Sequence, residues 1–385
     1  MKSVYFDHAA TTPVDPRVLA QMLPYFCERY GNPSEIHRLG REARTAVEVA
    51  RAQVAAGLGA GEKEIVFTAG GTEADNLALI GYLQRFEPGH FIISAIEHPA
   101  VMEPARALNR LGWAVDFIPV DGDGVIDVGA YEQAFRDDTR LASVMYANNV
   151  VGTIQPIAEL ARIAHEKGAA FHTDAVQAVG SVPIDVGALG VDMLSLSGHK
   201  IYGPKGIGAL YVKRGTRLTP MLHGGGHERR LRSGTENVPG IVGLGAALEL
   251  ALAEMAAVRP RLEALRDHLA RGVLKSVPDV KYLGHPTARL PGNVSFTVRY
   301  IEGESMLLQL DTHGFMVSSG SACASGSLEP SHVILALGLG AEEAHGSLRL
   351  SLGRENTEAE ADAFIQVFPP IVEKLRQMSP LYVKG

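Results

Sequence analysis

The chain has 385 residues, of which 46% are hydrophobic and 21% charged, and its formal net charge is −7 at pH 7. This composition excludes a disordered or fibrous protein, and the acidic balance without a basic block gives no electrostatic footprint for nucleic acid or for an anionic membrane. We therefore expect small-molecule chemistry, with no direct nucleic-acid partner and no membrane association. The N-terminus has no basic-then-apolar leader and no uninterrupted apolar run approaches a membrane span, so we expect a cytoplasmic protein.

Short apolar runs alternate with helical patterns between residues 64 and 213. The strand-like runs lie at 64–71, 90–98, 113–120, 141–149, 170–176, 191–200 and 208–213. Helical spacing separates several of them, as at 72–86 and 156–168. This rhythm predicts an α/β fold with a mostly parallel, seven-stranded sheet that helices cover on both faces.

The pattern changes after a long Ala- and Leu-rich helical region that spans 237–258 and 261–274. Strand-like runs at 292–298, 314–320 and 347–353 then alternate with helical segments at 302–314 and 357–378. We interpret this part as a smaller α+β domain that begins near residue 259.

Polar residues follow the predicted strands, at the carboxyl ends where open α/β sheets bind their ligands. They are Gly70, Gly71, Thr72, His98, Asn148, Asn149, Asp174, Gln177, Ser197, His199 and Lys200. A carboxylate, imidazoles, amides, hydroxyls, an amine and a glycine turn on one rim can hold a polar, phosphorylated cofactor.

The stretch "TAGGTEADN" predicts the phosphate site. A Gly-Gly turn before a helix leaves backbone N–H groups free at the helix N-terminus, and Thr72 would cap that helix and bind the same phosphate. An ordinary strand-to-helix loop with a threonine cap is the alternative. The chain has neither a P-loop nor a G-x-G-x-x-G fingerprint after its first strands, which disfavours ATP and NAD.

Lys200, in "SLSGHKIYGPKG", directly follows an apolar strand. Partial desolvation there would make its amine a usable nucleophile that holds a carbonyl cofactor as a Schiff base, whereas most lysines in such places are simply exposed. Asp174 ends another strand, and pyridoxal phosphate needs a carboxylate at its ring nitrogen. The pair therefore predicts pyridoxal phosphate.

The two cysteines have different surroundings. Cys323 lies in "SSGSACASGS", where no apolar neighbour would pack it, so we predict a chemical role; a tolerated loop cysteine is the alternative. Cys27 follows apolar helical residues and is predicted to pack. His223 and His227 are four apart, but the glycines between them argue against a helix, and we predict no metal site.

These segments resemble the cysteine desulfurases of the NifS/IscS type, within the aspartate-aminotransferase-like fold (fold type I) of pyridoxal-phosphate enzymes. The similarity covers nearly the whole chain, from "YFDHAATTPVDPRV" through "GGTEADN", "EHPAV", "NNVVGTIQPI", "HTDAVQAVG" and "RSGTEN" to "SLRLSLGR". It implies a large cofactor domain at 16–258 and a small domain, formed by 1–15 and 259–385, that carries the Cys323 segment.

The resemblance also implies a role for each matched residue. Lys200 would bind the cofactor covalently and take the substrate Cα proton, and Asp174 would pair with the ring nitrogen. His98 would stack on the ring and act in proton transfer. Gln177 and Asn149 would contact the region of the phenolic oxygen, and Asn149 would also contact the substrate.

The phosphate and the substrate carboxylate have their own implied ligands. The phosphate would be held by Gly71, Thr72, Ser197 and His199. The partner subunit's Thr235 would complete this cradle, which implies a homodimer. Arg349 would bind the substrate carboxylate as a bidentate pair, with Arg354 as the alternative.

The implied reaction converts L-cysteine to L-alanine and leaves the sulfur as a persulfide on Cys323, from which an acceptor protein takes it. An iron–sulfur scaffold, a tRNA-thiolation relay and a DNA-sulfur-modification system are the open possibilities for that acceptor. Another enzyme of the same fold, such as a selenocysteine lyase, an aminotransferase or a kynureninase-like hydrolase, is one alternative. A sulfur-delivery scaffold with a structural cofactor is another.

Overall fold

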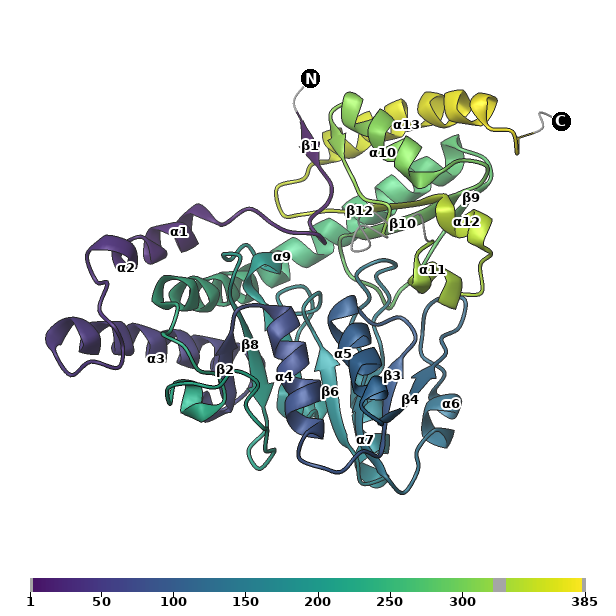
Figure 1. The fold of residues 1–385 in the computed structure, drawn as a ribbon. Helices are drawn as coiled ribbons and strands as arrows, with labels where there is room; N and C mark the ends of the chain where they lie inside the picture. Colours follow the sequence, from purple (N-terminus) through teal and green to yellow (C-terminus); the bar gives the residue numbers. More distant parts are fainter. Residues whose placement is uncertain (1–2, 321–329, 383–385) are drawn as a thin grey trace.

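A computed structural model describes residues 3–320 and 330–382. Seven strands form its main sheet in the order β2-β8-β7-β6-β5-β3-β4 (Figure 1). They are β2 (Ile65–Thr68), β3 (His90–Ser94), β4 (Ala114–Ile118), β5 (Thr139–Ser143), β6 (Ala170–Asp174), β7 (Met193–Ser197) and β8 (Gly208–Val212). Only β8 is antiparallel to its neighbours within this sheet, which confirms the predicted mostly parallel, seven-stranded arrangement.

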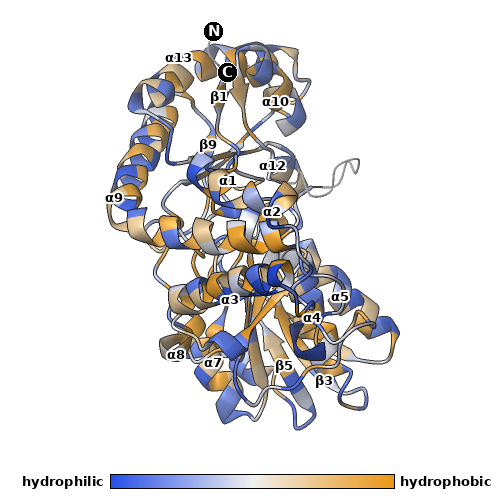
Figure 2. Ribbon diagram, turned by 90° about the vertical axis from the view of Figure 1, so that its left-hand side faces the viewer, coloured by the Kyte–Doolittle hydropathy of each residue, from blue (hydrophilic) through white to orange (hydrophobic). Residues whose placement is uncertain are grey.

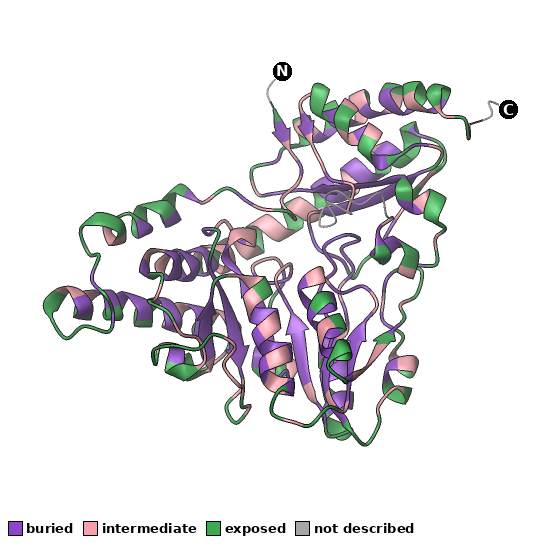
Figure 3. Cartoon of the chain, viewed as in Figure 1, coloured by how far each residue is buried: buried purple, intermediate pink, exposed green. Residues whose placement is uncertain are grey.

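Helices cover both faces of the main sheet, because its strands are apolar on both sides. In β3, Phe91 packs in the core under α4 (Gly71–Leu83) and α5 (Pro99–Arg110). The next residue, Ile92, packs in the opposite core under α3 (Arg38–Leu58) and α7 (Ile157–Glu166). Successive strand side chains point to opposite faces, so every position of β3 is buried, as are those of β2, β7 and β8 (Figure 3). In the edge strand β4 only Ile118 is buried.

A second core lies around a three-stranded antiparallel sheet in which β10 (Asn293–Val298) sits between β9 (Val280–Tyr282) and β12 (Ser347–Ser351). The helices α10 (Gly303–Thr312) and α13 (Glu358–Met378) contribute apolar residues to it. The N-terminal strand β1 (Val4–Tyr5) joins this part by pairing in parallel with β11 (Phe315–Met316). The chain therefore begins beside its own C-terminal half.

One helix, α9 (Val238–Ser276), connects the two cores along one side of the molecule (Figure 2). Its residues up to Leu248 are buried in the core of the main sheet, and those from Leu265 onwards in the second core. The predicted boundary between residues 258 and 259 falls inside this helix.

Helix α9 is strongly apolar, although Glu249 and Glu254 interrupt its apolar run. An 18-residue window of it has a mean hydropathy of 1.8, and it is long and apolar enough to cross a membrane. Of that window, 39% is buried inside the chain, where the helix packs against α3, α13 and α1 (Pro16–Met22). A helix that contributes to two cores meets the same criterion of length and composition as a membrane span.

The remaining helices are short. They are α2 (Pro24–Cys27), η1 (Glu62–Glu64), α6 (Val128–Gln133), α8 (Val186–Leu189), η2 (Gly198–Lys200), η3 (Glu228–Arg230), α11 (His332–Ala336) and α12 (Ala341–His345). The predicted packing of Cys27 is wrong: α2 is a single turn with no buried residue, and Cys27 is an exposed free thiol.

Candidate active site

The carboxyl ends of β6 and β7 and the N-terminus of α4 meet at a cavity of about 220 Å³. Its lining brings together the predicted residues Gly71, Thr72, His98, Asn149, Asp174, Gln177, Ser197, His199, Lys200 and Arg349. Parallel strands end at one edge of the sheet, which explains why residues so distant in sequence converge. Arg349 comes from the second core, so both halves of the molecule build the cavity.

The N-terminus of α4 forms one end of this cavity. The helix begins at Gly71 with Gly70 as its N-cap, so the prediction that Thr72 caps it is wrong; Thr72 lies inside the first turn and is exposed. A Cβ on Gly71 would lie 2.7 Å from Cγ2 of Val176, and only glycine permits this approach. The first N–H groups of a helix lack intrahelical partners and attract an anion.

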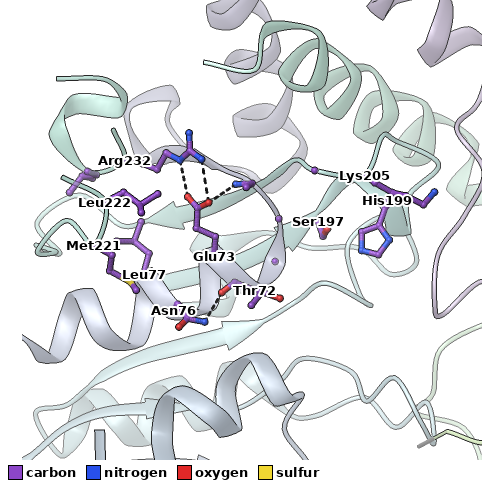
Figure 4. Close-up of a pocket in the computed structure, with 15 residues that line it drawn as sticks. Thr72, Glu73, Asn76, Leu77, Ser197, His199, Lys205, Met221, Leu222 and Arg232 are labelled. Carbon is purple, nitrogen blue, oxygen red and sulfur yellow. Dashed lines mark hydrogen bonds and ion pairs between the residues drawn. The ribbon is translucent and has the colours of Figure 1, made fainter. Parts of the chain in front are cut away.

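A second, more open cavity of about 640 Å³ adjoins this helix end (Figure 4). Thr72, Ser197 and His199 line both cavities. On the far side, Arg232 pairs with Glu73 at 2.9 Å. These three predicted phosphate ligands therefore lie between the two cavities, and an anion bound to them would be accessible from either cavity.

Lys200 lies in η2, immediately after β7, and its amine reaches across to the N-terminal segment. Its Nζ donates to the carbonyl oxygens of Ala9, at 2.5 Å, and Ala10, at 2.8 Å. Gln177 also donates to the Ala9 carbonyl, at 3.0 Å. Residues 9–10 therefore form a wall of the cavity that the strand-end argument did not predict.

His199 is held by the same N-terminal segment. The backbone N–H of Thr12 donates to its carbonyl at 3.0 Å, and its Nδ1 lies 3.1 Å from Oγ1 of Thr11. Burial, together with Lys200 and Lys205, lowers the pKa of His199 to about 4. The ring is therefore neutral at pH 7 and offers an anion a hydrogen bond rather than a charge.

His98 is the N-cap of α5. Its Nδ1 accepts a hydrogen bond from the backbone N–H of Ala100 at 3.1 Å. In the neutral ring the proton is then on Nε2. The predicted stacking residue therefore has a fixed orientation and a defined tautomer.

Two buried acids that the sequence analysis missed lie near Asp174. Asp174 is 5% exposed and its Oδ1 accepts from the N–H of Val176 at 2.9 Å. Burial raises its pKa, and His98 and Lys200 lower it. Asp75 and Glu97 are 1% and 0% exposed, and burial raises the pKa of both, that of Glu97 to about 8.

Sequence signals for these two acids exist but are weak. Asp75 stands four residues after Gly71, one helical turn further along the face that meets the cavity. Glu97 directly precedes His98. Neither position is distinctive without the knowledge that it is buried.

Arg349 is buried in β12 and is held by two contacts. Its Nη2 pairs with Oδ1 of Asp7 at 2.8 Å, and its Nη1 donates to the carbonyl of Asn149 at 3.1 Å. Its Nε has no hydrogen-bond acceptor among the described residues. The sequence analysis did not identify Asp7.

Arg354, the alternative ligand, lies outside this cavity. It pairs with Asp15 and, at 3.2 Å, with Glu254, and its guanidinium lies 4.1 Å from the centre of the Tyr202 ring. These partners occupy the charged group, so Arg349 is the better placed to meet a substrate in the cavity.

Asn148 and Asn149 have separate tasks. The side chain of Asn148 donates to the carbonyl of Ile96 at 2.9 Å and accepts from the N–H groups of Val150 and Val151. It shapes the loop, whereas Asn149 lines the cavity.

Cys323 lies outside the described residues, but the described segments on either side of it are held at the site. On one side, the N–H of Ser318 donates to the carbonyl of Arg349 at 3.1 Å. On the other side, Nε2 of His332 lies 3.0 Å from the carbonyl oxygen of Glu97, the residue before His98. Both anchors are next to residues that line the cavity.

Two predicted features lie elsewhere. Thr235 is exposed in a separate pocket with Tyr30 and Asn237, so it does not reach the cavity of its own chain. His227 lies 3.9 Å from Glu236, and the described part of the chain contains no group of three His, Cys, Asp or Glu side chains that could hold a metal ion.

Comparisons with known proteins identify the family of this chain. The Aminotransferase class-V family model matches residues 4–364. Cysteine desulfurase IscS of Methanosarcina thermophila is 53% identical over 385 residues, which cover 100% of this chain and 95% of that protein. A solved NifS-like protein has a TM-score of 0.91 at 39% identity, covering 97% of this chain and 100% of its own.

A further solved structure, described as SspA in complex with cysteine, has a TM-score of 0.81 and 38% identity, over 92% of this chain and 99% of its own. The family match, the full-length sequence identity and the similarity of fold all indicate the same family. The chain belongs to the class-V aminotransferase family and, within it, to the cysteine desulfurases of the IscS and NifS type.

Proposed function

We propose that this chain is a pyridoxal-phosphate-dependent cysteine desulfurase, which converts L-cysteine to L-alanine and transfers the sulfur to its own Cys323. One observation carries the proposal: Lys200, Asp174 and the N-terminus of α4 line a single cavity, and the described segments flanking Cys323 are anchored beside it.

The residues fit the cofactor. Lys200 supplies the amine that would bind it, Asp174 a buried carboxylate for its ring nitrogen, and α4 an unpaired helix N-terminus for its phosphate. The neutral His199 and the hydroxyls of Thr72 and Ser197 would add hydrogen bonds to that phosphate. When bound, pyridoxal phosphate supplies an electron sink for the Cα–H bond of an amino acid.

The chain's own residues then have defined tasks. Arg349, held by Asp7, would bind the substrate carboxylate. Lys200 would accept the Cα proton, and Nε2 of His98 would hold a proton close to the reacting groups. The Ala9 and Ala10 carbonyls, which Lys200 contacts in this structure, would hold its amine between proton transfers.

The sulfur transfer balances without an external oxidant. The thiolate of Cys323 would attack the substrate sulfur, so that an S–S bond forms as the C–S bond breaks. The carbon fragment gains a proton and leaves as alanine, and the enzyme keeps a persulfide. An acceptor protein with a thiol of its own would then regenerate the Cys323 thiol.

We also propose a cytoplasmic homodimer. The exposed position of Thr235, away from its own cavity, supports the role of the partner subunit's Thr235 as a phosphate ligand. The exposed free thiol of Cys27 favours a reducing compartment.

The test is the release of alanine and sulfide from L-cysteine in the presence of a thiol reductant, with protein loaded with pyridoxal phosphate. We expect equal amounts of the two products from the wild type. Cys323→Ser should lose both while keeping the bound cofactor's visible absorbance, because the site lacks only its sulfur acceptor. Lys200→Ala should lose activity and the covalently bound cofactor together.

Cys27→Ser is the matched control, since it removes the exposed thiol and leaves the site untouched. It should retain wild-type activity. A Cys323→Ser variant that still releases alanine and sulfide would refute the role of Cys323, and a wild type that releases no alanine from L-cysteine would refute the desulfurase.

A further inference from the structure

Asp75 is a second carboxyl group in the proposed cofactor cavity, beside Asp174. It projects from the first turns of α4 and is 1% exposed. No hydrogen-bond donor among the described residues reaches its Oδ1. An ionised carboxylate in this position would be both desolvated and incompletely hydrogen-bonded, which is costly.

The imidazole of His172 lies close to Asp75 but does not neutralise it. His172 lies on β6, and its Nδ1 and Nε2 are 2.8 Å and 3.0 Å from the hydroxyls of Ser143 and Ser195. Its Nε2 is 3.6 Å from Oδ1 of Asp75, beyond hydrogen-bond range. Burial lowers the pKa of His172 to about 3, so the ring is neutral at pH 7.

Two further buried acids act on Asp75. Burial has the largest effect on the pKa of Asp75 and raises it; Asp174 on β6 and Glu97 after β3 raise it further, and a hydrogen bond with Ser195 lowers it. On its own helix, Glu73 is turned away toward Arg232. His98 and Lys200, which line the same cavity, lower the pKa of Asp174. Adjacent buried carboxyl groups repel each other strongly when both are ionised.

We propose that Asp75 stays protonated in the folded protein, so that Asp174 alone carries the negative charge that faces the cofactor's ring nitrogen. Asp75 is then a positioning residue, which fills the space beside Asp174 with a neutral polar group and keeps the local charge at minus one. The inference rests on the proposed cofactor site, because the charge of Asp174 has this purpose only when pyridoxal phosphate is bound.

Infrared spectroscopy tests the protonation state directly. Protein made with isotope-labelled aspartate should show a protonated carboxyl band, shifted by the label, at about pH 7.5, well above the ordinary aspartate pKa. The band should be present with and without pyridoxal phosphate and absent in Asp75→Asn. Glu97→Gln separates the glutamic acid band, which the aspartate label does not shift. The absence of a labelled band would overturn the proposal without any variant.

Cofactor binding by two variants gives an independent readout. Asn resembles a protonated aspartic acid, so Asp75→Asn should bind pyridoxal phosphate within about 3-fold of the wild type and keep the pH midpoint of the cofactor's visible band. Asp75→Ala removes the polar group beside Ser195 and should weaken binding by about 10-fold. Asp137→Asn, at an exposed position, is the control for loss of a carboxylate.

The contrary result is equally clear. If Asp75→Asn weakens binding as much as Asp75→Ala and moves the pH midpoint, the negative charge of Asp75 is required and the proposal is wrong. If Asp75→Asn does not fold, the labelled band of the wild type still decides. If the wild type does not bind pyridoxal phosphate, the proposed function is wrong. The infrared measurement on cofactor-free protein does not depend on cofactor binding, so it tests the protonation of Asp75 separately.

Discussion

At the scale of single residues, Arg349 shows how one side chain is prepared for a ligand. Asp7 and the carbonyl of Asn149 take two of its nitrogens and fix the guanidinium, while Nε has no acceptor among the described residues. A buried guanidinium that is fixed before the substrate arrives loses little freedom on binding, which strengthens recognition.

We therefore expect Arg349→Gln to raise the KM for L-cysteine by about 10- to 100-fold, because the substrate carboxylate would lose a charged hydrogen-bonded pair. Binding of pyridoxal phosphate should change by less than about 3-fold, because Arg349 is assigned to the substrate. Steady-state kinetics and a cofactor titration measure the two effects. Arg162→Gln, which breaks an exposed pair with Glu166, is the control. An unchanged KM would show that another group binds the carboxylate.

At the scale of elements, the start of α4 is placed by contact with the turn after β6. Gly71 lies against Val176, and a side chain on Gly71 would push the helix N-terminus away from the cavity. Overpacking of this kind costs about 1–3 kcal/mol.

Gly71→Ala should therefore weaken binding of pyridoxal phosphate by about 10-fold, although alanine favours helix formation. The double variant Gly71→Ala with Val176→Ala should recover most of the loss, because the second change removes the atom that clashes. A titration of the four proteins with cofactor forms a double-mutant cycle. Equal losses in the single and double variants would mean that the contact with Val176 does not position the helix.

At the scale of the whole molecule, the buried acids make stability depend on pH. Glu97 accepts from Oγ of Ser94 at 2.5 Å and from the N–H of Met145 at 2.8 Å, while its Oε2 has no partner among the described residues. Burial raises its pKa from 4.5 to about 8. The folded state therefore holds a proton that the unfolded chain releases near pH 4.5, so this contribution to stability is complete below that pH and is lost as the pH rises through 8.

Glu97→Gln keeps the neutral form at every pH. We expect its thermal unfolding midpoint to match that of the wild type near pH 5. Near pH 8 its midpoint should be higher by about 4 °C, because the wild type loses on the order of 3 kcal/mol of unfolding free energy between these two pH values. Scans of cofactor-free protein across this range measure the gap. A gap that is constant with pH, or that narrows as the pH rises, would contradict the protonation of Glu97.

Much of the fold follows from local pattern in the sequence. Six strands of the main sheet lie within the predicted runs, and β5 begins two residues before its run, at Thr139. The agreement arises because strands buried on both faces are continuously apolar and the turns between them are polar. Two local predictions failed for tertiary reasons. Cys27 is exposed because α2 packs no residue into a core. Thr72 is not a cap because α4 begins at Gly71, two residues before the start that a cap at Thr72 requires.

The sequence by itself determined the class of fold. It also determined the amine of Lys200, the carboxylate of Asp174 and the Gly70–Gly71 loop of the candidate site, because each of these follows the end of a strand that local hydrophobicity reveals. Only the tertiary structure decided which acids are buried near Asp174, and that Arg349 rather than Arg354 lines the cavity. The two arginines differ in their distant partners, Asp7 for one and Asp15 for the other. Burial and pairing arise between segments far apart in the chain, and no local pattern encodes them.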